Sequence, residues 1–120
     1  MKLKNMLAGM EYCGEVAGPK RHYTVFRNRT GYVLCSQKTD SVWKGDFAIV
    51  RSKAVEYMAG RLKRQTGLTS ALIRDRTRTA QFTRERFDVL NGMYVLIALG
   101  RAKVDTRYKQ GSAQHFNVRG

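Results

Sequence analysis

The hydrophobic pattern of the first fifty residues predicts one helix followed by a small sheet. Apolar residues recur at spacings of three and four from Leu3 to Met10, which is the period of a helix with one buried face. Gly14 and the Gly18-Pro19 pair follow, and these residue types end helices. Three short runs rich in aromatic and β-branched residues come next, at 23–26, 32–35 and 47–50. Because residues 28–31 suit a hairpin turn, we expect these runs to pair as antiparallel strands.

The pattern after residue 50 changes to that of helices. Ser52 is placed to cap a helix, because its hydroxyl can accept a hydrogen bond from an unpaired N–H group of the first turn. This helix ends at Thr66-Gly67, and its apolar stripe consists of Val55, Met58, Ala59 and Leu62. A second, short helix begins at Thr69 and buries Leu72 and Ile73. The strongest helical period runs from Thr83 to Leu99 and predicts an amphipathic helix, whose apolar positions are Phe87, Leu90, Met93, Tyr94 and Ile97.

The hydrophobic period after Gly100 changes from that of a helix to that of a strand. Val104, Thr106 and Tyr108 alternate with charged residues, and Phe116 and Val118 alternate with polar ones after a turn at 110–113. This pattern predicts a C-terminal β-hairpin with a basic outer strand.

Together these elements predict an α+β fold in one domain that covers residues 1–120. A chain of 120 residues with 42% hydrophobic content has enough apolar surface for one modest core. The N-terminal helix and small antiparallel sheet occupy residues 1–50, and the helices with the C-terminal hairpin occupy residues 51–120. The longest apolar run, 93–99, is far shorter than the roughly 20 residues of a membrane-spanning helix, so no membrane partner is expected.

The charge balance adds a polyanionic partner to this picture. Lys and Arg number 23 against nine Asp and Glu, which gives a formal net charge of +14. Residues 61–120 carry 13 of the basic residues and four of the acidic ones, and five arginines fall between 74 and 86. Arginine can bind a phosphate or a guanine edge with two hydrogen bonds, whereas lysine acts as a point charge. We therefore expect the carboxyl-side half to bind nucleic acid.

Residues 68–118 resemble a winged helix-turn-helix domain. The resembling stretch reads Leu68-Thr69-Ser70-Ala71-Leu72-Ile73-Arg74-Asp75, continues through 83–99, and leads through Gly100-Arg101-Ala102-Lys103-Val104 into the hairpin. The resemblance implies a winged-helix-like helical unit in which the helix after the turn enters the major groove of DNA. It also implies that the hairpin lies along the DNA backbone or the minor groove. The segment 77–82 departs from the family because it is longer than the usual tight turn.

Nine residues of this region form the candidate nucleic-acid site. They are Arg74, Arg76, Arg78, Arg84, Arg86, Asn91, Lys103, Arg107 and Lys109. Arg84, Asp88 and Asn91 share one face of the predicted reading helix, where Arg can read guanine and Asn can read adenine. The same spacing also fits a solvated helix face with an Arg84–Asp88 ion pair. Lys103, Arg107 and Lys109 suit phosphate contacts or an inert surface equally well.

The sequence gives little sign of catalysis or of a cofactor. None of the nine acidic residues stands two positions before a lysine, which excludes one common pattern of metal-dependent nucleases. Two cysteines and two histidines lack the spacing of a metal site, so we expect two free thiols in a reducing compartment and no metal or cofactor. No signal-peptide pattern follows Met1, which favours a cytoplasmic protein. Because no catalytic motif is found, we also expect that the protein is not an enzyme.

The leading hypothesis is a sequence-specific double-stranded DNA-binding protein that acts as a small transcriptional regulator. Its N-terminal half would then support the basic half or join two copies in a homodimer. The first alternative is an RNA- or single-strand-binding module that stacks bases on aromatic residues of the sheet, namely Tyr23, Phe26, Tyr32 and Trp43. The second alternative is a small mobile-element inhibitor that docks on a nucleic-acid-processing complex through its basic surface.

Overall fold

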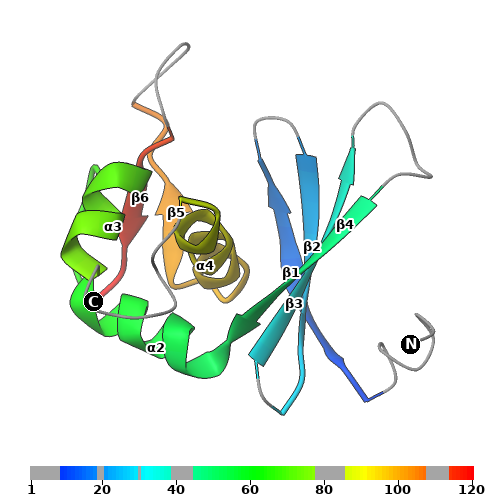
Figure 1. Cartoon of the computed structure of the whole chain (residues 1–120). Helices are drawn as coiled ribbons and strands as arrows, with labels where there is room; N and C mark the ends of the chain where they lie inside the picture. Colours follow the sequence, from blue (N-terminus) through cyan, green and yellow to red (C-terminus); the bar gives the residue numbers. More distant parts are fainter. Residues whose placement is uncertain (1–8, 19–20, 30, 39–44, 78–85, 108–113) are drawn as a thin grey trace.

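Four consecutive strands begin the part of the chain that the computed structural model describes, which comprises residues 9–18, 21–29, 31–38, 45–77, 86–107 and 114–120. The strands are β1 (Glu11–Ala17), β2 (Arg21–Arg27), β3 (Gly31–Lys38) and β4 (Gly45–Arg51). They are followed by α2 (Ser52–Arg61), α3 (Ser70–Thr77), α4 (Arg86–Ala98), β5 (Ala102–Val104) and β6 (Phe116–Val118). Figure 1 shows the sheet on one side of the molecule and α2, α3 and the β5–β6 hairpin on the other, with α4 between them.

The sheet is an antiparallel meander in the order β1-β2-β3-β4. Val25 of β2 lies opposite Leu34 of β3, and Leu34 lies opposite Ala48 of β4, so these residues share the face that points to the core. The neighbouring row, which contains Phe26 and the 75% exposed Ile49, occupies the other face because side chains alternate along a strand. One face of the sheet therefore packs inward and the other carries exposed apolar groups.

The helices α2 and α3 begin in different ways. Strand β4 leads directly into α2, so Arg51 takes the N-cap position and its side chain makes no capping hydrogen bond in the described structure. The prediction that Ser52 caps this helix is therefore wrong by one residue. At α3, which is predicted to begin at Thr69, the hydroxyl oxygen of Thr69 accepts a hydrogen bond from the N–H of Leu72 at 3.2 Å. Ile73 is buried as predicted, whereas Leu72 is 41% exposed. None of the helices in the described part of the chain is long and apolar enough to cross a membrane.

Helix α4 is buried on all sides at its centre. The four consecutive residues from Met93 to Leu96 are each at most 3% exposed, and four residues extend around more than a full turn of a helix. On one side Tyr94 stacks on Tyr23 of β2, with ring centroids 4.6 Å apart. On the other side α4 packs against α2, α3 and β5. The prediction of an amphipathic helix with an open solvent face is wrong here, because the sheet covers the second face.

The predicted C-terminal hairpin is confirmed, although its first strand ends at Val104 and Thr106 lies in a turn. The hairpin is also attached to the helices. Strands β5 and β6 pair antiparallel, with Val104 opposite Phe116. Phe116 is fully buried and also exchanges two backbone hydrogen bonds with Leu68, at 2.9 and 2.8 Å. Leu68 lies between α2 and α3, so this bridge attaches the hairpin to the connection between those two helices.

The predicted fold class needs correction at the N-terminus. The class is α+β, but the described chain opens on a four-stranded sheet and not on a helix followed by three strands. Residues 3–8 of the predicted helix lie outside the described residues, and β1 begins at Glu11. Gly14 was interpreted as the end of a helix. In the structure it belongs to β1, where an added Cβ would lie 3.1 Å from the carbonyl oxygen of Ala98 in α4.

Two helical glycines are expected to respond to alanine in opposite directions. A Cβ added at Gly92 would overlap the sulfur of buried Met58, whereas a Cβ added at Gly60 would meet no described atom within 4 Å. Gly92→Ala should lower the unfolding free energy, because overpacking costs about 1–3 kcal/mol and the gain in helix propensity is about 1 kcal/mol. Gly60→Ala should raise it by up to about 1 kcal/mol.

Urea unfolding of both variants measures these changes, and Gly60→Ala serves as the matched control for helix propensity. An increase in stability at both positions would show that α2 and α4 do not approach closely at Gly92.

Candidate nucleic-acid interface

The nine candidate residues fall into three groups in the structure. Arg78, Arg84 and Lys109 lie outside the described residues. Arg86 is the first residue of α4, and the structure describes its backbone only. Arg74 and Arg76 are exposed on α3, and Lys103 and Arg107 are exposed on the hairpin. Asn91 is half-buried on α4. The described structure thus presents the basic candidates on α3 and on the hairpin, and places Asn91 on the central helix.

The basic residues of α2 and α3 are held together without a carboxylate. The side chain of Arg61, the last residue of α2, donates from Nε to the carbonyl oxygen of Arg76 at 3.4 Å. The Arg76 guanidinium donates to the side-chain oxygen of Gln65, and the amide nitrogen of Gln65 donates to the carbonyl of Arg61 at 3.0 Å. Neutral acceptors therefore position both guanidinium groups. We call Arg61 and Arg76, which these bonds link, the α2–α3 arginine cluster. Arg74 precedes Arg76 by two residues and therefore lies on a different side of α3.

Within the described residues, no ion pair neutralises the positive charge of this cluster. The ion pairs within the described residues join other groups, and none of them involves Arg61, Arg74 or Arg76. A bound anion would supply the negative charge that these guanidinium groups do not receive from the described residues. Sequence reasoning missed Arg61 and Gln65, because they are 15 and 11 residues away from Arg76 and carry no motif.

Arg107 differs from Lys103 because a carboxylate binds it. The side chain of Asp105 is 4% exposed, and its Oδ2 accepts a hydrogen bond from Nη2 of Arg107 at 2.6 Å. Its Oδ1 accepts hydrogen bonds from the backbone N–H and from Nε of Arg107, at 3.1 and 3.0 Å. These bonds, the side-chain ones above all, hold the pKa of Asp105 well below its usual range. The short Asp-Thr-Arg spacing is the sequence signal for this turn. Lys103 is exposed and has no ion pair with a described residue.

The aromatic residues of the sheet do not form one stacking surface. Tyr23 is stacked on Tyr94, and Tyr32 is 6% exposed, so both belong to the core. Phe26 lies on the opposite face, where it makes an edge contact with Tyr12 at 6.0 Å. Trp43 lies outside the described residues. The strand register, which alternates side chains between the two faces, separates these residues.

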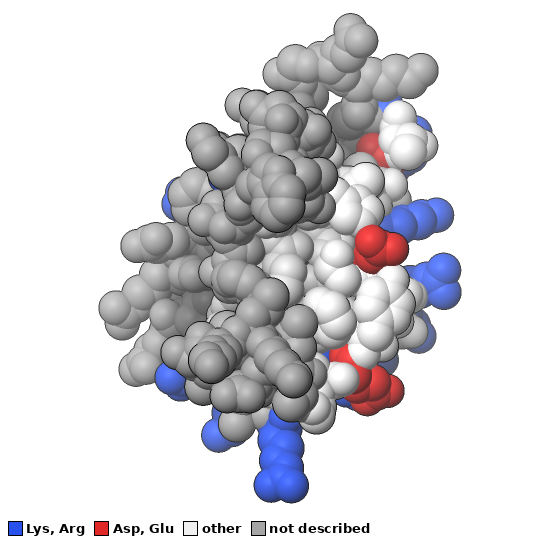
Figure 2. Space-filling model, turned by 90° about the vertical axis from the view of Figure 1, so that its right-hand side faces the viewer, with Lys and Arg blue, Asp and Glu red and all other residues white. Residues whose placement is uncertain are grey.

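The sheet also differs from the helices in its charge. In β1 and β2, Glu11 binds Arg27 at 2.6 Å and Glu15 binds His22 at 2.7 Å. The hydrogen bond from His22 lowers the pKa of Glu15. Figure 2, which looks onto the right-hand side of Figure 1, shows acidic side chains beside basic ones along one margin of this face. The β1–β2 surface is therefore locally balanced, in contrast to the α2–α3 arginine cluster.

The cysteines and histidines of the described residues form no metal site. Cys13 and Cys35 are free thiols, and burial raises the pKa of both. No group of three or more His, Cys, Asp or Glu residues within the described chain is placed to hold a metal ion. Raised thiol pKa values also leave little reactive thiolate at neutral pH.

Asp105 is expected to make the hairpin sensitive to acid. Its pKa is lowered in the folded protein, so its contribution to stability is present above the unfolded value of about 3.9 and is lost as the pH falls toward the folded value. Asp105→Asn should therefore lower stability at pH 7 and flatten the rise of stability with pH in the acid range. Thermal unfolding between pH 2 and pH 7 measures both effects.

Glu11→Gln, at a surface ion pair whose carboxylate side is 66% exposed, is the control for this measurement. An Asp105→Asn protein whose stability follows the wild-type pH profile would show that Asp105 does not anchor Arg107.

Comparison with known proteins places this chain in no family. No family model matches it, no curated protein matches it, and no solved structure matches it. The function is therefore argued from the geometry and charge of the described residues.

Proposed function

We propose that this chain binds double-stranded DNA through the portion that runs from α2 to β6. The order of helix, helix, longer helix and hairpin is the one that the winged helix-turn-helix resemblance implies. The observation that carries the proposal is the pairing of Leu68 with Phe116, which holds the hairpin beside the helices while the basic side chains stay exposed. A rigid scaffold with exposed cations at two neighbouring elements suits a polyanion of regular shape.

The exposed cations of the two elements supply the phosphate contacts in this proposal. The α2–α3 arginine cluster presents guanidinium groups whose planar forks match phosphate oxygens. Lys103 adds a further charge on β5. Contacts of this kind bind any sequence and weaken as salt increases, because counterions compete for the phosphates.

In this proposal, the residues that recognise DNA bases are those at the start of α4 and in the segment between α3 and α4. Asn91 is half-buried in the middle of the molecule, so it is a poor candidate for contact with a base edge. Arg78 and Arg84 lie in the sequence between α3 and α4, and Arg86 begins α4. Arginine in such a place can bind guanine with two hydrogen bonds, and sequence-specific binding of this kind suits a small transcriptional regulator.

The stacking alternative has less support from the arrangement of the sheet. Tyr23 and Tyr32 would have to leave the core to reach a base, which exposes apolar surface and breaks the Tyr23–Tyr94 contact. Single-stranded nucleic acid therefore remains an outcome of the test below and not a second proposal.

Removal of single charges from the proposed surface should weaken duplex binding. Arg74→Ala, Arg76→Ala and Lys103→Ala should each lower affinity several-fold on every sequence, and each should reduce the salt slope by about 1. Fluorescence anisotropy with a short labelled duplex at several salt concentrations measures both quantities. Arg29→Ala is the matched control, because Arg29 is exposed in the turn between β2 and β3 and carries the same charge.

An equal loss of affinity in Arg29→Ala would mean that net charge alone drives binding, and would overturn the assignment to this surface. Selection of bound molecules from a random duplex pool should recover a sequence motif if the protein reads bases. Stronger binding to single strands, or stable capture by a protein complex with no affinity for DNA, would replace the proposal with one of the two alternatives.

A further inference from the structure

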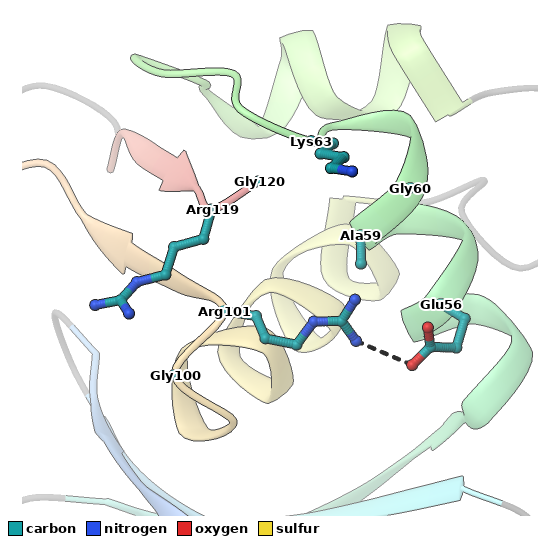
Figure 3. A pocket seen from close by; sticks show the side chains of 8 residues that line it. All are labelled: Glu56, Ala59, Gly60, Lys63, Gly100, Arg101, Arg119 and Gly120. Atoms are coloured by element: carbon teal, nitrogen blue, oxygen red, sulfur yellow. Dashed lines mark hydrogen bonds and ion pairs between the residues drawn. The ribbon is translucent and has the colours of Figure 1, made fainter.

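A hollow of about 460 Å³ lies between α2, the turn from α4 to β5, and the residues after β6. Its volume falls within the range of small-molecule sites in proteins. Figure 3 shows that Glu56 and Gly60 come from α2, that Lys63 follows this helix, and that Gly100 and Arg101 precede β5. Ala59, which is 5% exposed, forms part of the wall.

The charged groups around the hollow are mainly basic. Lys63, Arg101 and Arg119 line it together with one acidic side chain, Glu56, and with Gly120. The Arg101 guanidinium binds Oε1 of Glu56 at 3.0 Å, while Lys63 has no ion pair within the described chain. In Figure 3 the side chains of Lys63 and Arg101 lie on either side of Ala59, and the Arg119 guanidinium points away from them. Lys63 and Arg101 are therefore the pair that can act on one ligand.

Glycine at position 60 keeps one wall of the hollow bare. Gly60 is the penultimate residue of α2, where alanine would favour the helix, and no described atom lies within 4 Å of an added Cβ. Gly100 also lines the hollow, but its φ of +75° explains that glycine by backbone conformation alone. Gly60 has neither positive φ nor a close neighbour among the described residues. Its absent side chain instead leaves room beside Lys63 and Arg101.

We propose that this hollow binds a small molecule through a phosphate group held between Lys63 and Arg101. The Arg101 guanidinium offers two parallel N–H groups that match two phosphate oxygens, and the Lys63 ammonium adds a second charge. Glu56 competes with the ligand for Arg101, because both are anions that bind the same guanidinium. The site involves none of the nine candidate residues, and its lining residues differ from those of the α2–α3 arginine cluster, although both lie in the portion from α2 to β6.

Pyrophosphate is the probe for this site. Titration into ¹⁵N-labelled full-length protein at constant ionic strength should shift the amide signals of Gly60, Gly100 and Arg101 in a saturable manner. Lys63→Ala should weaken binding by about tenfold, as expected when one charge-assisted hydrogen bond is lost. Lys53→Ala is the matched control, since Lys53 is an exposed lysine of α2 that carries the same charge and does not line the hollow.

Two further variants separate a specific site from general attraction to a basic protein. Glu56→Gln should strengthen pyrophosphate binding, because the competing carboxylate becomes neutral. Gly60→Ala should weaken binding although it stabilises the fold, since the new methyl group enters the hollow. Circular dichroism on each variant verifies that the protein is folded.

The proposal is overturned if Lys53→Ala and Lys63→Ala weaken binding equally, or if the signals of Gly60, Gly100 and Arg101 do not shift. A nucleotide and a DNA backbone both carry phosphate groups, so the experiment is repeated with adenosine diphosphate and then with a short DNA duplex added to the nucleotide complex. Retention of the bound nucleotide when duplex is added identifies a small-molecule site. Displacement by the duplex shows that DNA occupies the hollow, which overturns the small-molecule assignment.

Discussion

The burial of α4 on both sides is the constraint on which the rest of the fold depends. The sheet contacts this helix through Tyr23 and Tyr94, and α2 approaches it at Gly92, where no side chain separates the helix from Met58. Neither the sheet nor the α2–α3 pair has another described element of comparable size to cover its apolar face. The two portions of the chain therefore share one core, and α4 is common to both.

This packing also decides which polar groups remain available for a partner. Because α4 is enclosed at its centre, the basic groups that supply the proposed phosphate contacts lie on α2, on α3 and on the hairpin, and not on α4. In the sheet, Glu11 and Glu15 bind the neighbouring basic residues, whereas a main-chain carbonyl holds Arg61 and the side chain of Gln65 holds Arg76. A group held by a neutral acceptor keeps its charge for an external anion, and this difference favours the helical portion as the binding surface.

Much of the local structure could be predicted from the sequence, because it depends on neighbours along the chain. The start of α3 next to Thr69, the end of α4 near Gly100 and the C-terminal hairpin are of this kind. The sequence pattern does not predict strand β1, because Gly14 is a residue type that ends helices. In the structure, Gly14 allows β1 to pack closely against Ala98. In the candidate site, the exposure of Arg74 and Lys103 was predictable from their polarity. The contact of Arg61 with Arg76 was not, because it joins two helices.

The sequence alone thus determined the period, type and approximate limits of most elements, together with the excess of positive charge. These properties follow from local backbone preferences and from composition. Only the tertiary structure decided that α4 is covered on two faces, that Asp105 binds Arg107 and that Lys63 and Arg101 border one hollow. The physical reason is that a hydrophobic period shows that a face will be buried but does not show which element will bury it. A charge becomes free or neutralised only when the folded chain places its neighbours.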